Sequence, residues 1–114
     1  MKQDSFKEFV LDQLAGLEPV TCRAMFGGFG LYHHDVFFGI LFKGRLYFKT
    51  HGENRSAYEE YGMQPFRPSD QQTLKNYYEV PPDILEDGDE LILWARQAAG
   101  RRTSAGQRDA GPKF

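Results

Sequence analysis

The sequence has little cysteine and no long apolar segment. Cys22 is the single cysteine, so an internal disulfide cannot form, as is usual for a reducing compartment. No stretch approaches the roughly 20 apolar residues that a membrane-spanning helix needs. The N-terminal segment MKQDSFKEFVLDQ also lacks the apolar run of a signal peptide. We therefore expect a cytoplasmic protein that does not associate with membranes.

Basic residues are scarce over most of the chain. Residues 1–98 hold 10 Lys and Arg against 15 Asp and Glu, a net charge of −5. Because non-specific DNA affinity comes mainly from Lys and Arg at phosphates, this acidic part is not expected to grip a duplex by itself. Residues 99–114 instead carry a net charge of +3. Residues 101–114 contain little apolar material, so we predict a disordered basic tail after a domain of residues 1–100.

Motifs for phosphate binding are absent as well. Gly27, Gly28 and Gly30 fit neither of the usual glycine-rich phosphate patterns, and a strand-like segment follows them where a phosphate loop requires a helix. Turn or bulge glycines, or a close approach of two backbones, explain this cluster better. We therefore expect no bound cofactor.

Metal-binding and catalytic patterns are equally weak. His33, His34 and Asp35 lack the ligand spacing of a zinc site, and a polar hairpin turn accounts for them. No serine lies in a nucleophile elbow, and Cys22 in a strand is typical of a small buried side chain. We expect no enzyme and no metal. A small enzyme or metal site around Cys22 and the histidines remains a third hypothesis.

Aromatic residues are plentiful, at 15% of the chain, and the periodicity around them defines the elements. Ser5 and Glu8 have the spacing of a capping box, so the first helix is predicted to begin at Asp4 or Ser5 and to end before Pro19. Its apolar stripe consists of Phe6, Phe9, Val10, Leu14 and Leu17.

Residues 20–50 alternate with a period of two and contain three turn signals, which predicts four strands in an antiparallel meander. The turn signals are Gly27-Gly28, His34-Asp35 and Lys43-Gly44. In the third strand the apolar residues Val36, Phe38, Ile40 and Phe42 are predicted to share one face.

The second half of the chain alternates helices with one strand. Residues 53–61 are predicted to form a short helix that Asn54 caps and Gly62 ends. Pro65 and Pro68 predict an irregular stretch that continues until a fifth strand begins, over residues 74–80. Asp87 and Glu90 form a second capping box for a final helix, which ends at Gly100.

The element order is therefore α-β-β-β-β-α-β-α. This order predicts an α+β fold of two layers, in which helices cover one face of a mainly antiparallel sheet of about five strands.

The fourth strand presents a face of mixed character. Alternation places Arg45, Tyr47 and Lys49 on the side opposite Leu46 and Phe48. Such a face is a candidate contact surface for a partner, and it also resembles a platform on which nucleic-acid bases stack. Mixed outer faces are also ordinary on antiparallel sheets, which favours plain solvation when the residues are taken alone.

The order of the residues carries more information than their chemistry. The segment RAMFGGFGLY, from Arg23 to Tyr32, and the segment LYFK, from Leu46 to Lys49, resemble the N-terminal domain of the TfoX/Sxy family of competence regulators. Further matches are Phe38, Gly39, Tyr61, Gly62, Pro65, Phe66, Tyr77, Tyr78, Val80 and Pro81. The likeness runs from the first helix to about Ala98. On this basis we predict that residues 1–100 form a domain similar to the TfoX N-terminal domain.

This resemblance implies a bacterial, non-enzymatic regulatory domain. Full-length relatives regulate genes for DNA uptake and are thought to work with the cyclic-AMP receptor protein, so the implied partner is a protein such as a transcription factor. The contact surface that we expect for this partner is the one derived above from the fourth strand, Arg45, Tyr47 and Lys49. Direct nucleic-acid binding through these residues and the basic tail is the alternative. The relatives also carry a second, helical domain that this sequence lacks, so control of competence need not transfer.

The motif itself reads as structural framework. Gly27, Gly28 and Gly30 are expected to permit a bend, and Phe26, Phe38 and Phe48 to fill the core. Arg23 is the exception, because a buried arginine must pair. It is either a structural anchor for a carboxylate such as Glu79, which we favour, or part of a contact surface.

Overall fold

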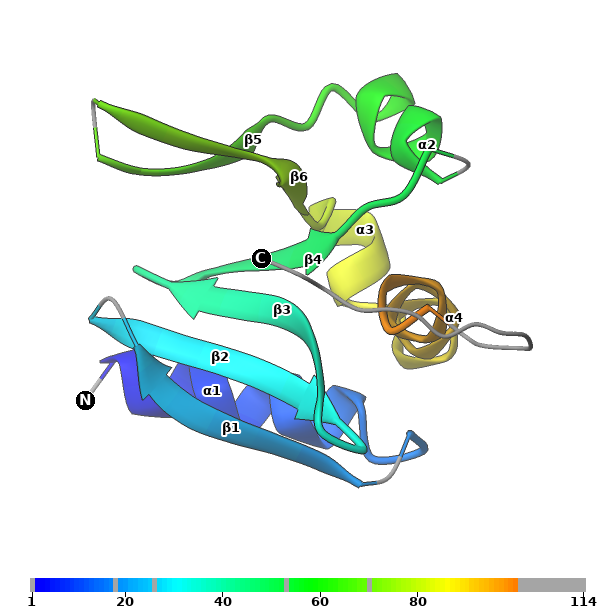
Figure 1. The fold of residues 1–114 in the computed structure, drawn as a ribbon. Coiled ribbons are helices and arrows are strands. Elements are labelled where there is room, and N and C mark those ends of the chain that lie inside the picture. The colour runs from blue at the N-terminus through cyan, green and yellow to red at the C-terminus, as the bar shows by residue number, and fades with distance from the viewer. Residues whose placement is uncertain (1, 18, 26, 53, 70, 101–114) are drawn as a thin grey trace.

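The computed structural model of the chain describes residues 2–17, 19–25, 27–52, 54–69 and 71–100. Within these residues the order of elements is α1 (Lys2–Gln13), β1 (Val20–Met25), β2 (Gly28–His33), β3 (Val36–Phe42), β4 (Arg45–Lys49), α2 (Arg55–Glu60), β5 (Pro65–Ser69), β6 (Gln72–Glu79), α3 (Pro82–Leu85) and α4 (Gly88–Ala98) (Figure 1). The predicted α+β class is confirmed. The predicted tail, residues 101–114, lies outside the described residues.

The strands form a single antiparallel sheet with the order β1-β2-β3-β4-β6-β5. The predicted meander of four strands is confirmed, and β6 joins its β4 edge. Two of the connecting turns have left-handed backbone angles at His34, Asp35, Lys43 and Gly44, with φ between 52° and 74°. Two-residue turns of this kind match the right-handed twist of paired strands, which explains why these short segments close hairpins.

The region of Pro65 and Pro68 differs from its prediction as an irregular stretch. These residues lie in β5, which pairs with β6 and forms one edge of the sheet. An edge strand tolerates proline because one row of its backbone groups faces no neighbour. The register shifts on both sides of Phe66, so the prolines distort this strand without abolishing it. The sheet therefore has one strand more than the predicted five.

A bulge in the β2–β3 pair changes which residues face the core. Tyr32 lies opposite Phe37 and Leu31 lies opposite Gly39, so Phe38 is the extra residue between the two pairs. An extra residue reverses the alternation of the strand. Phe38 consequently joins the core beneath the helices, whereas Ile40 packs on the opposite face. The prediction that Val36, Phe38, Ile40 and Phe42 share one face is therefore wrong.

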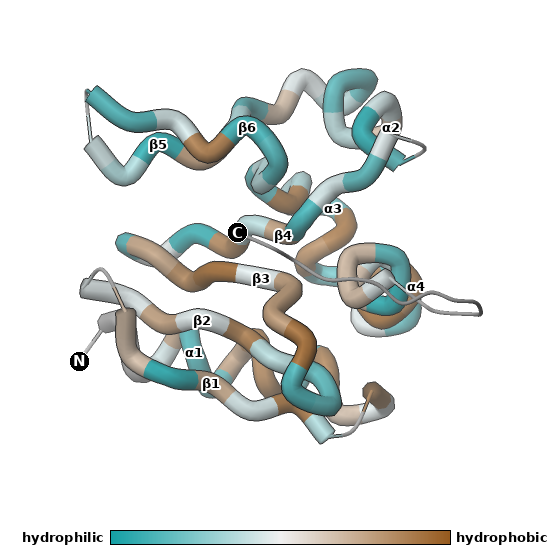
Figure 2. The backbone as a smooth tube through the Cα atoms, viewed as in Figure 1, coloured by the Kyte–Doolittle hydropathy of each residue, from teal (hydrophilic) through white to brown (hydrophobic). Residues whose placement is uncertain are grey.

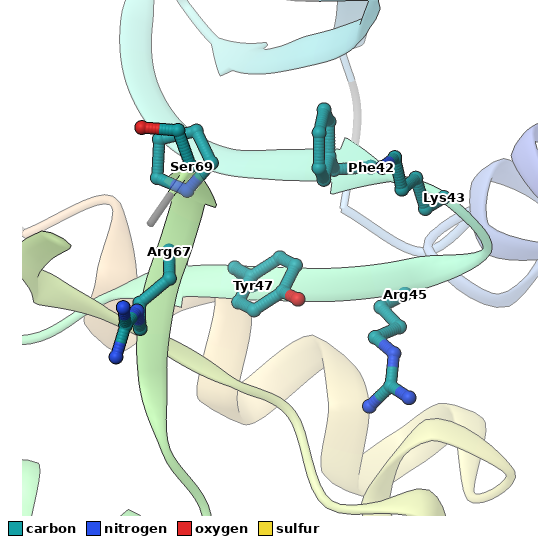
Figure 3. A pocket seen from close by; sticks show the side chains of 7 residues that line it. Phe42, Lys43, Arg45, Tyr47, Arg67 and Ser69 are labelled. Atoms are coloured by element: carbon teal, nitrogen blue, oxygen red, sulfur yellow. The ribbon is translucent and has the colours of Figure 1, made fainter. Parts of the chain in front are cut away.

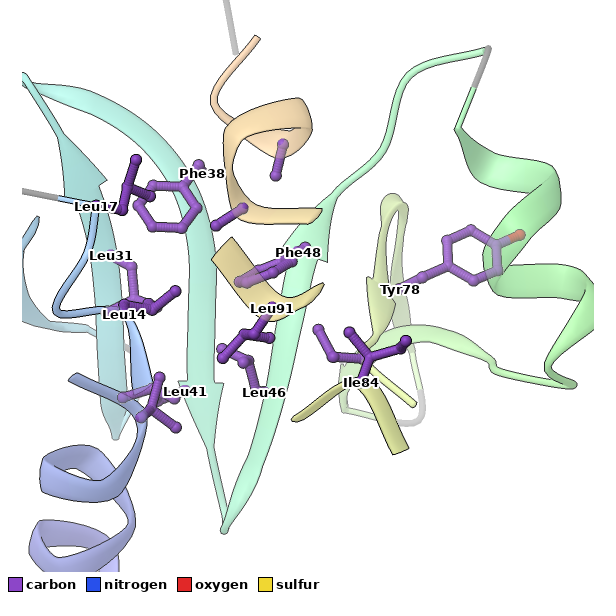
Figure 4. Packing of buried hydrophobic residues seen from close by; sticks show 14 of the residues in the cluster. Leu14, Leu17, Leu31, Phe38, Leu41, Leu46, Phe48, Tyr78, Ile84 and Leu91 are labelled. Atoms are coloured by element: carbon purple, nitrogen blue, oxygen red, sulfur yellow. The ribbon is translucent and has the colours of Figure 1, made fainter. Parts of the chain in front are cut away.

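All four helices contribute to a core on one face of the sheet. Figure 4 shows Leu14 and Leu17, which follow α1, together with Ile84 of α3 and Leu91 of α4, packed against strand residues that include Leu31 and Phe48. Phe38 and Phe48 are fully buried, and their ring centroids are 5.7 Å apart. The core role predicted for these two phenylalanines is confirmed, while Phe26 lies outside the described residues.

The capping predictions have mixed outcomes. Asp87 Oδ1 accepts a hydrogen bond from the backbone N–H of Glu90, which confirms the cap of α4. In contrast, α1 already includes Lys2, so Ser5 lies inside the helix and does not cap it. The Asn54 side chain also caps no helix, because its Oδ1 accepts a 2.6 Å hydrogen bond from the backbone N–H of His51.

The apolar stripe of α1 is interrupted by Gln13, and the structure gives this residue a specific role. Gln13 Nε2 donates a 2.9 Å hydrogen bond to the backbone oxygen of Leu85 at the end of α3. The contact joins the end of α1 to the end of α3. No helix in the described part of the chain is long and apolar enough to cross a membrane.

Candidate functional site

The face of the sheet opposite the helical core carries the candidate site, and we call it the helix-free face. Residues that lie opposite each other on antiparallel strands project to the same side. The strand register therefore places one row across five strands: Arg23, Gly30, Ile40, Tyr47 and Glu79. The motif arginine and the predicted surface of β4 thus share one face, a relation that the sequence does not reveal.

Arg23 does not anchor the carboxylate of Glu79, so the favoured prediction for this residue is wrong. Its side chain is exposed, and its guanidinium lies 4.8 Å from the ring centroid of Tyr32. Glu79 lies at the far end of the row and binds Arg45 instead, with Nη1 of Arg45 at 3.0 and 3.2 Å from the two carboxylate oxygens. The register, with three strands between Arg23 and Glu79, explains why Arg45 is the partner.

Tyr32, which contacts Arg23, is also the first of three neighbouring aromatic rings. The ring centroid of Tyr32 is 5.2 Å from that of Phe37, which in turn is 5.6 Å from that of Tyr77. Tyr32 and Phe37 are half-buried, while Tyr77 is buried. Arg23, Tyr32 and Phe37 therefore form a partly exposed patch at the β1 side of the helix-free face, and we call it the Arg23 patch.

The predicted contact residues of β4 differ in exposure. The Arg45 side chain is 60% exposed, but Tyr47 is only 9% exposed, so its ring is not part of the open surface that the prediction assumed. Lys49 is half-buried, and this burial lowers the pKa of its ammonium group. For Tyr47, burial raises the pKa of the phenol, and the nearby Glu79 carboxylate adds to this effect.

Tyr47 is buried because the β5–β6 hairpin brings Phe66 over it. The two ring centroids are 4.5 Å apart, and Phe66 also meets Phe42 edge-on at 5.3 Å. These residues belong to a second apolar cluster that contains strand residues alone: Ile40, Tyr47, Phe66 and Tyr77, with Phe37, Phe42 and Leu74 at its margin. The hairpin thus covers part of the helix-free face, and its tip is hydrophilic (Figure 2).

A cleft of about 420 Å³ lies between the β3–β4 turn and β5. Figure 3 shows Arg45 and Arg67 on either side of Tyr47, with Lys43 beside Arg45 and Ser69 beyond Arg67. The lining residues are Phe42, Lys43, Arg45, Tyr47, Arg67, Pro68 and Ser69, three of them basic and none acidic. We call this site the basic cleft.

The prediction from sequence missed Lys43, Arg67 and Ser69 as residues of a site. Arg67 and Ser69 fall in the segment that the prolines marked as irregular, and Lys43 was assigned only to a turn. Alternation in β5 would have indicated a strand, but it gave no sign that this strand curls toward β4. Only the hairpin contact between Phe66 and Tyr47 brings the two groups of residues together.

The glycines of the family-like motif fit tightly packed positions. A Cβ added at Gly28 would overlap the backbone oxygen of Leu41, and one at Gly30 would overlap Sδ of Met25. Gly27 has a φ of 82°, which favours glycine. The predicted bend at Gly27 and the predicted close approach of two backbones are therefore confirmed. Gly30 lies in the row from Arg23 to Tyr47, and the side chains around it occupy the space that a side chain of its own would need.

The phenol groups of two tyrosines are buried in the apolar clusters. The hydroxyls of Tyr58 and Tyr77 have no hydrogen-bond partner among the described residues. Burial raises the pKa of both phenols, so both stay protonated at neutral pH. The Tyr78 hydroxyl, in contrast, donates a 3.2 Å hydrogen bond to a carboxylate oxygen of Glu59.

The histidines and the cysteine take ordinary structural positions. The rings of His33 and His34 are 4.4 Å apart, and Nδ1 of His33 lies 3.1 Å from the backbone oxygen of Pro19. Cys22 is half-buried and packs against the helical core. Across the described ranges, no three His, Cys, Asp or Glu residues are placed to hold a metal ion.

Two comparisons with known proteins relate this chain to others. A family model described as the TfoX N-terminal domain matches residues 12–101. The chain is also similar to the DNA transformation protein TfoX1 of Aliivibrio fischeri, with 38% identity over 60 residues. That alignment covers 51% of this chain and 29% of the relative, so it spans less than a third of the relative's length.

Proposed function

Because the chain belongs to the family of the TfoX N-terminal domain, we propose that it is a non-enzymatic interaction domain that takes part in DNA transformation by contacting a regulatory protein. The proposed partner is a transcription factor with an acidic contact surface. The cytoplasm is the compartment in which such a partner would be met.

The observation that carries this proposal is the Arg23 patch. Arg23 belongs to the family-like motif, yet it lies exposed over Tyr32, and no carboxylate pairs with it among the described residues. Arginine, tyrosine and phenylalanine are enriched where proteins bind one another, and such residues often dominate the binding energy. A guanidinium that a tyrosine ring holds in place suits a carboxylate of a partner, because its planar fork can donate two parallel hydrogen bonds.

Charge supports a protein partner over nucleic acid for the described domain. Residues 1–98 are acidic overall, which opposes binding to a phosphate backbone. The alternative proposal also needs Tyr47 as a ring on which bases stack, and this ring packs against Phe66. The tail arginines, which the alternative also invokes, lie outside the described residues.

Site-specific photocrosslinking tests the proposal. A photoreactive phenylalanine replaces Tyr32 in the full chain, and cells of the source bacterium are irradiated before nuclease treatment and purification. Mass spectrometry then identifies the adducts. We expect one regulatory protein to crosslink, and Arg23→Glu to remove the adduct because it places a negative charge opposite the acidic surface.

The matched controls use the helical face. The same photoreactive residue in place of Leu93, which is 51% exposed on α4, is expected to give no such adduct. Arg96→Glu on α4 is expected to leave the Tyr32 adduct unchanged. Equal crosslinking from both positions, or adducts with nucleic acid alone, would refute the proposed contact.

A further inference from the structure

The outer edge of β1 is open along its whole length, and we call it the β1 edge. β1 is the first strand of the sheet, so it has a neighbour, β2, on one side alone (Figure 1). None of its six residues is buried. Among the described residues, no backbone group of β1 hydrogen-bonds to a partner outside the sheet. Such an edge presents a row of unpaired N–H and C=O groups to which another extended segment can add.

The opposite edge of the sheet is protected against such an addition. β5 contains Pro65 and Pro68, and its register shifts on both sides of Phe66. Prolines and bulges are common means by which proteins keep an edge strand from accepting another strand. The segment VTCRAM of β1 contains no proline, and its register with β2 is continuous. The β1 edge is therefore the one at which a strand can add.

Arg23 gives the β1 edge its charge. Its side chain is exposed on the helix-free face, and its guanidinium lies over the ring of Tyr32. The attraction to a ring face uses none of the N–H donors of a guanidinium. Neither β1 nor β2 contains an acidic residue. We propose, on the basis of the proposed function, that the regulatory partner adds an extended segment to the β1 edge, with an acidic side chain beside Arg23.

The alternation of β1 defines the sequence pattern of this segment. Residues that lie opposite each other on paired strands project to the same side. An acidic residue beside Arg23 thus lies on the helix-free face, and the residues before and after it lie on the helical side. There, Val20 and Cys22 pack against the helical core. Apolar side chains fit these two positions, so the recognised segment has an acidic residue between two apolar ones.

Charge favours an acidic partner over the other possible occupants of the β1 edge. Two copies of β1 that pair about the middle of the strand would place one Arg23 directly opposite or diagonal to the other, and like charges so close repel each other. Residues 101–114 contain four basic residues against one acidic residue, so Arg23 repels this segment as well. An acidic segment is attracted instead.

Nuclear magnetic resonance tests strand addition on the full chain. The probe is the capped peptide Lys-Thr-Val-Glu-Val-Thr-Lys, titrated to millimolar concentration into ¹⁵N-labelled protein. We expect saturable shifts of the amides in residues 20–25, and nuclear Overhauser contacts between the peptide backbone and β1. Replacing the peptide glutamate by glutamine should weaken binding about threefold, as expected for one exposed cross-strand ion pair. In Arg23→Gln the two peptides should bind equally, which assigns the effect to this pair.

Two controls separate strand pairing from attraction of charge alone. Arg96→Gln on α4 removes another exposed positive charge and should leave the difference between the peptides unchanged. The same peptide with two consecutive N-methylated residues keeps its charges but loses a donor on each of its edges, and it should not bind. Dispersed spectra verify that both variants fold.

Several results would overturn strand addition at the β1 edge. These are a titration without saturation, shifts centred on other elements, equal binding of the N-methylated peptide, and equal binding of the glutamine peptide to the unchanged chain. Shifts in β1 that appear without peptide as the protein is concentrated, together with a doubled mass in solution, would assign the edge to a second copy.

This test and the crosslinking test can fail separately. Peptide pairing without an adduct from Tyr32 would leave the β1 edge as a strand-binding site and refute the regulatory partner. An adduct from Tyr32 without peptide pairing would keep the partner and refute strand addition as its mode of binding.

Discussion

The two faces of the sheet bury their apolar residues in different ways. On one face, α1, α3 and α4 supply aliphatic side chains and α2 supplies Tyr58 to a core whose strand residues include Leu31, Phe38 and Phe48. On the other face, a β-hairpin supplies the cover, and three of the four buried members of that cluster are aromatic. The comparison teaches that a strand hairpin covers less of a sheet than a layer of helices does. Arg23 and Arg45 therefore remain exposed at its margin.

The largest expected effect lies on the helix-covered face. Phe48→Ala removes a fully buried ring that packs on Phe38, so the free energy of unfolding should fall by about 3–5 kcal/mol. Urea denaturation measures this loss. Val36→Ala, at a residue that is 44% exposed on β3, is the control and should change stability by less than about 0.5 kcal/mol. A loss below about 1 kcal/mol for Phe48→Ala would contradict this description of the core.

Phe66→Ala removes an equally buried ring on the helix-free face, but we expect a smaller and more local effect. Its loss should lie near the lower end of the range for this substitution, about 3 kcal/mol, because β5 lies at the sheet edge and can separate alone. Hydrogen exchange should show lost protection in β5 and β6 with β2 and β3 still protected. Uniform loss of protection across all strands would break the distinction between the faces.

Tyr77 on the helix-free face and Tyr58 in the core beneath the helices both make stability depend on pH. Its phenol and that of Tyr58 have an ordinary pKa of 10.0 when unfolded and a raised pKa when folded. Their contribution to stability is thus complete below pH 10.0 and is lost as the pH rises above it, because the unfolded chain releases its protons first. The loss is at most about 1.4 kcal/mol per pH unit for each phenol.

Tyr77→Phe should make the loss of stability at alkaline pH smaller, because only one of the two phenols remains. At neutral pH the variant should match or exceed the unchanged chain by up to about 1 kcal/mol, since the lost hydroxyl has no partner among the described residues. Thermal unfolding at a series of pH values measures both effects. Tyr61→Phe, at an exposed ring, serves as the control at neutral pH. A marked loss of stability in Tyr77→Phe at neutral pH would indicate that its hydroxyl is satisfied.

The smallest effect is expected at the exposed ion pair of the helix-free face. Glu79→Gln removes the charge that faces Arg45, whose side chain is 60% exposed, so stability should change by less than about 1 kcal/mol. Added salt should reduce even this difference. Denaturation at low and high ionic strength measures it, and Asp83→Gln on α3 is a control for the loss of an exposed acid. A larger, salt-insensitive loss would mean that Glu79 contributes to packing as well as to charge.

Local signals predicted most of the fold. Turn residues such as Asp35 and Gly44 located the hairpins, and the Asp87 cap located the final helix, because each depends on backbone groups only a few residues away. The prediction was wrong where a distant partner decided the outcome. The bulge at Phe38 exchanged the two faces to which the residues of β3 point. β5 formed despite two prolines because it pairs with β6 at the edge of the sheet.

The candidate site was predictable only in part. Alternation in β4 correctly separated Arg45 and Tyr47 from the core residues Leu46 and Phe48. It could not show that Phe66 would bury Tyr47, or that Arg67 would lie beside it, because these contacts join β4 to β5, which are separated by α2 along the chain and by β6 in the sheet. Arg23 was assigned the wrong partner for the same reason.

The sequence alone determined most of the elements, the meander and the family-like motif, since hydrogen bonds and periodicity within a few residues are sufficient for these. Tertiary structure alone decided that the hairpin of β5 and β6 curls over one face. That curl buries Tyr47 and gathers Lys43, Arg45 and Arg67 around a cleft. The physical reason is that packing between distant strands depends on the twist and the edges of the complete sheet, which no short segment encodes.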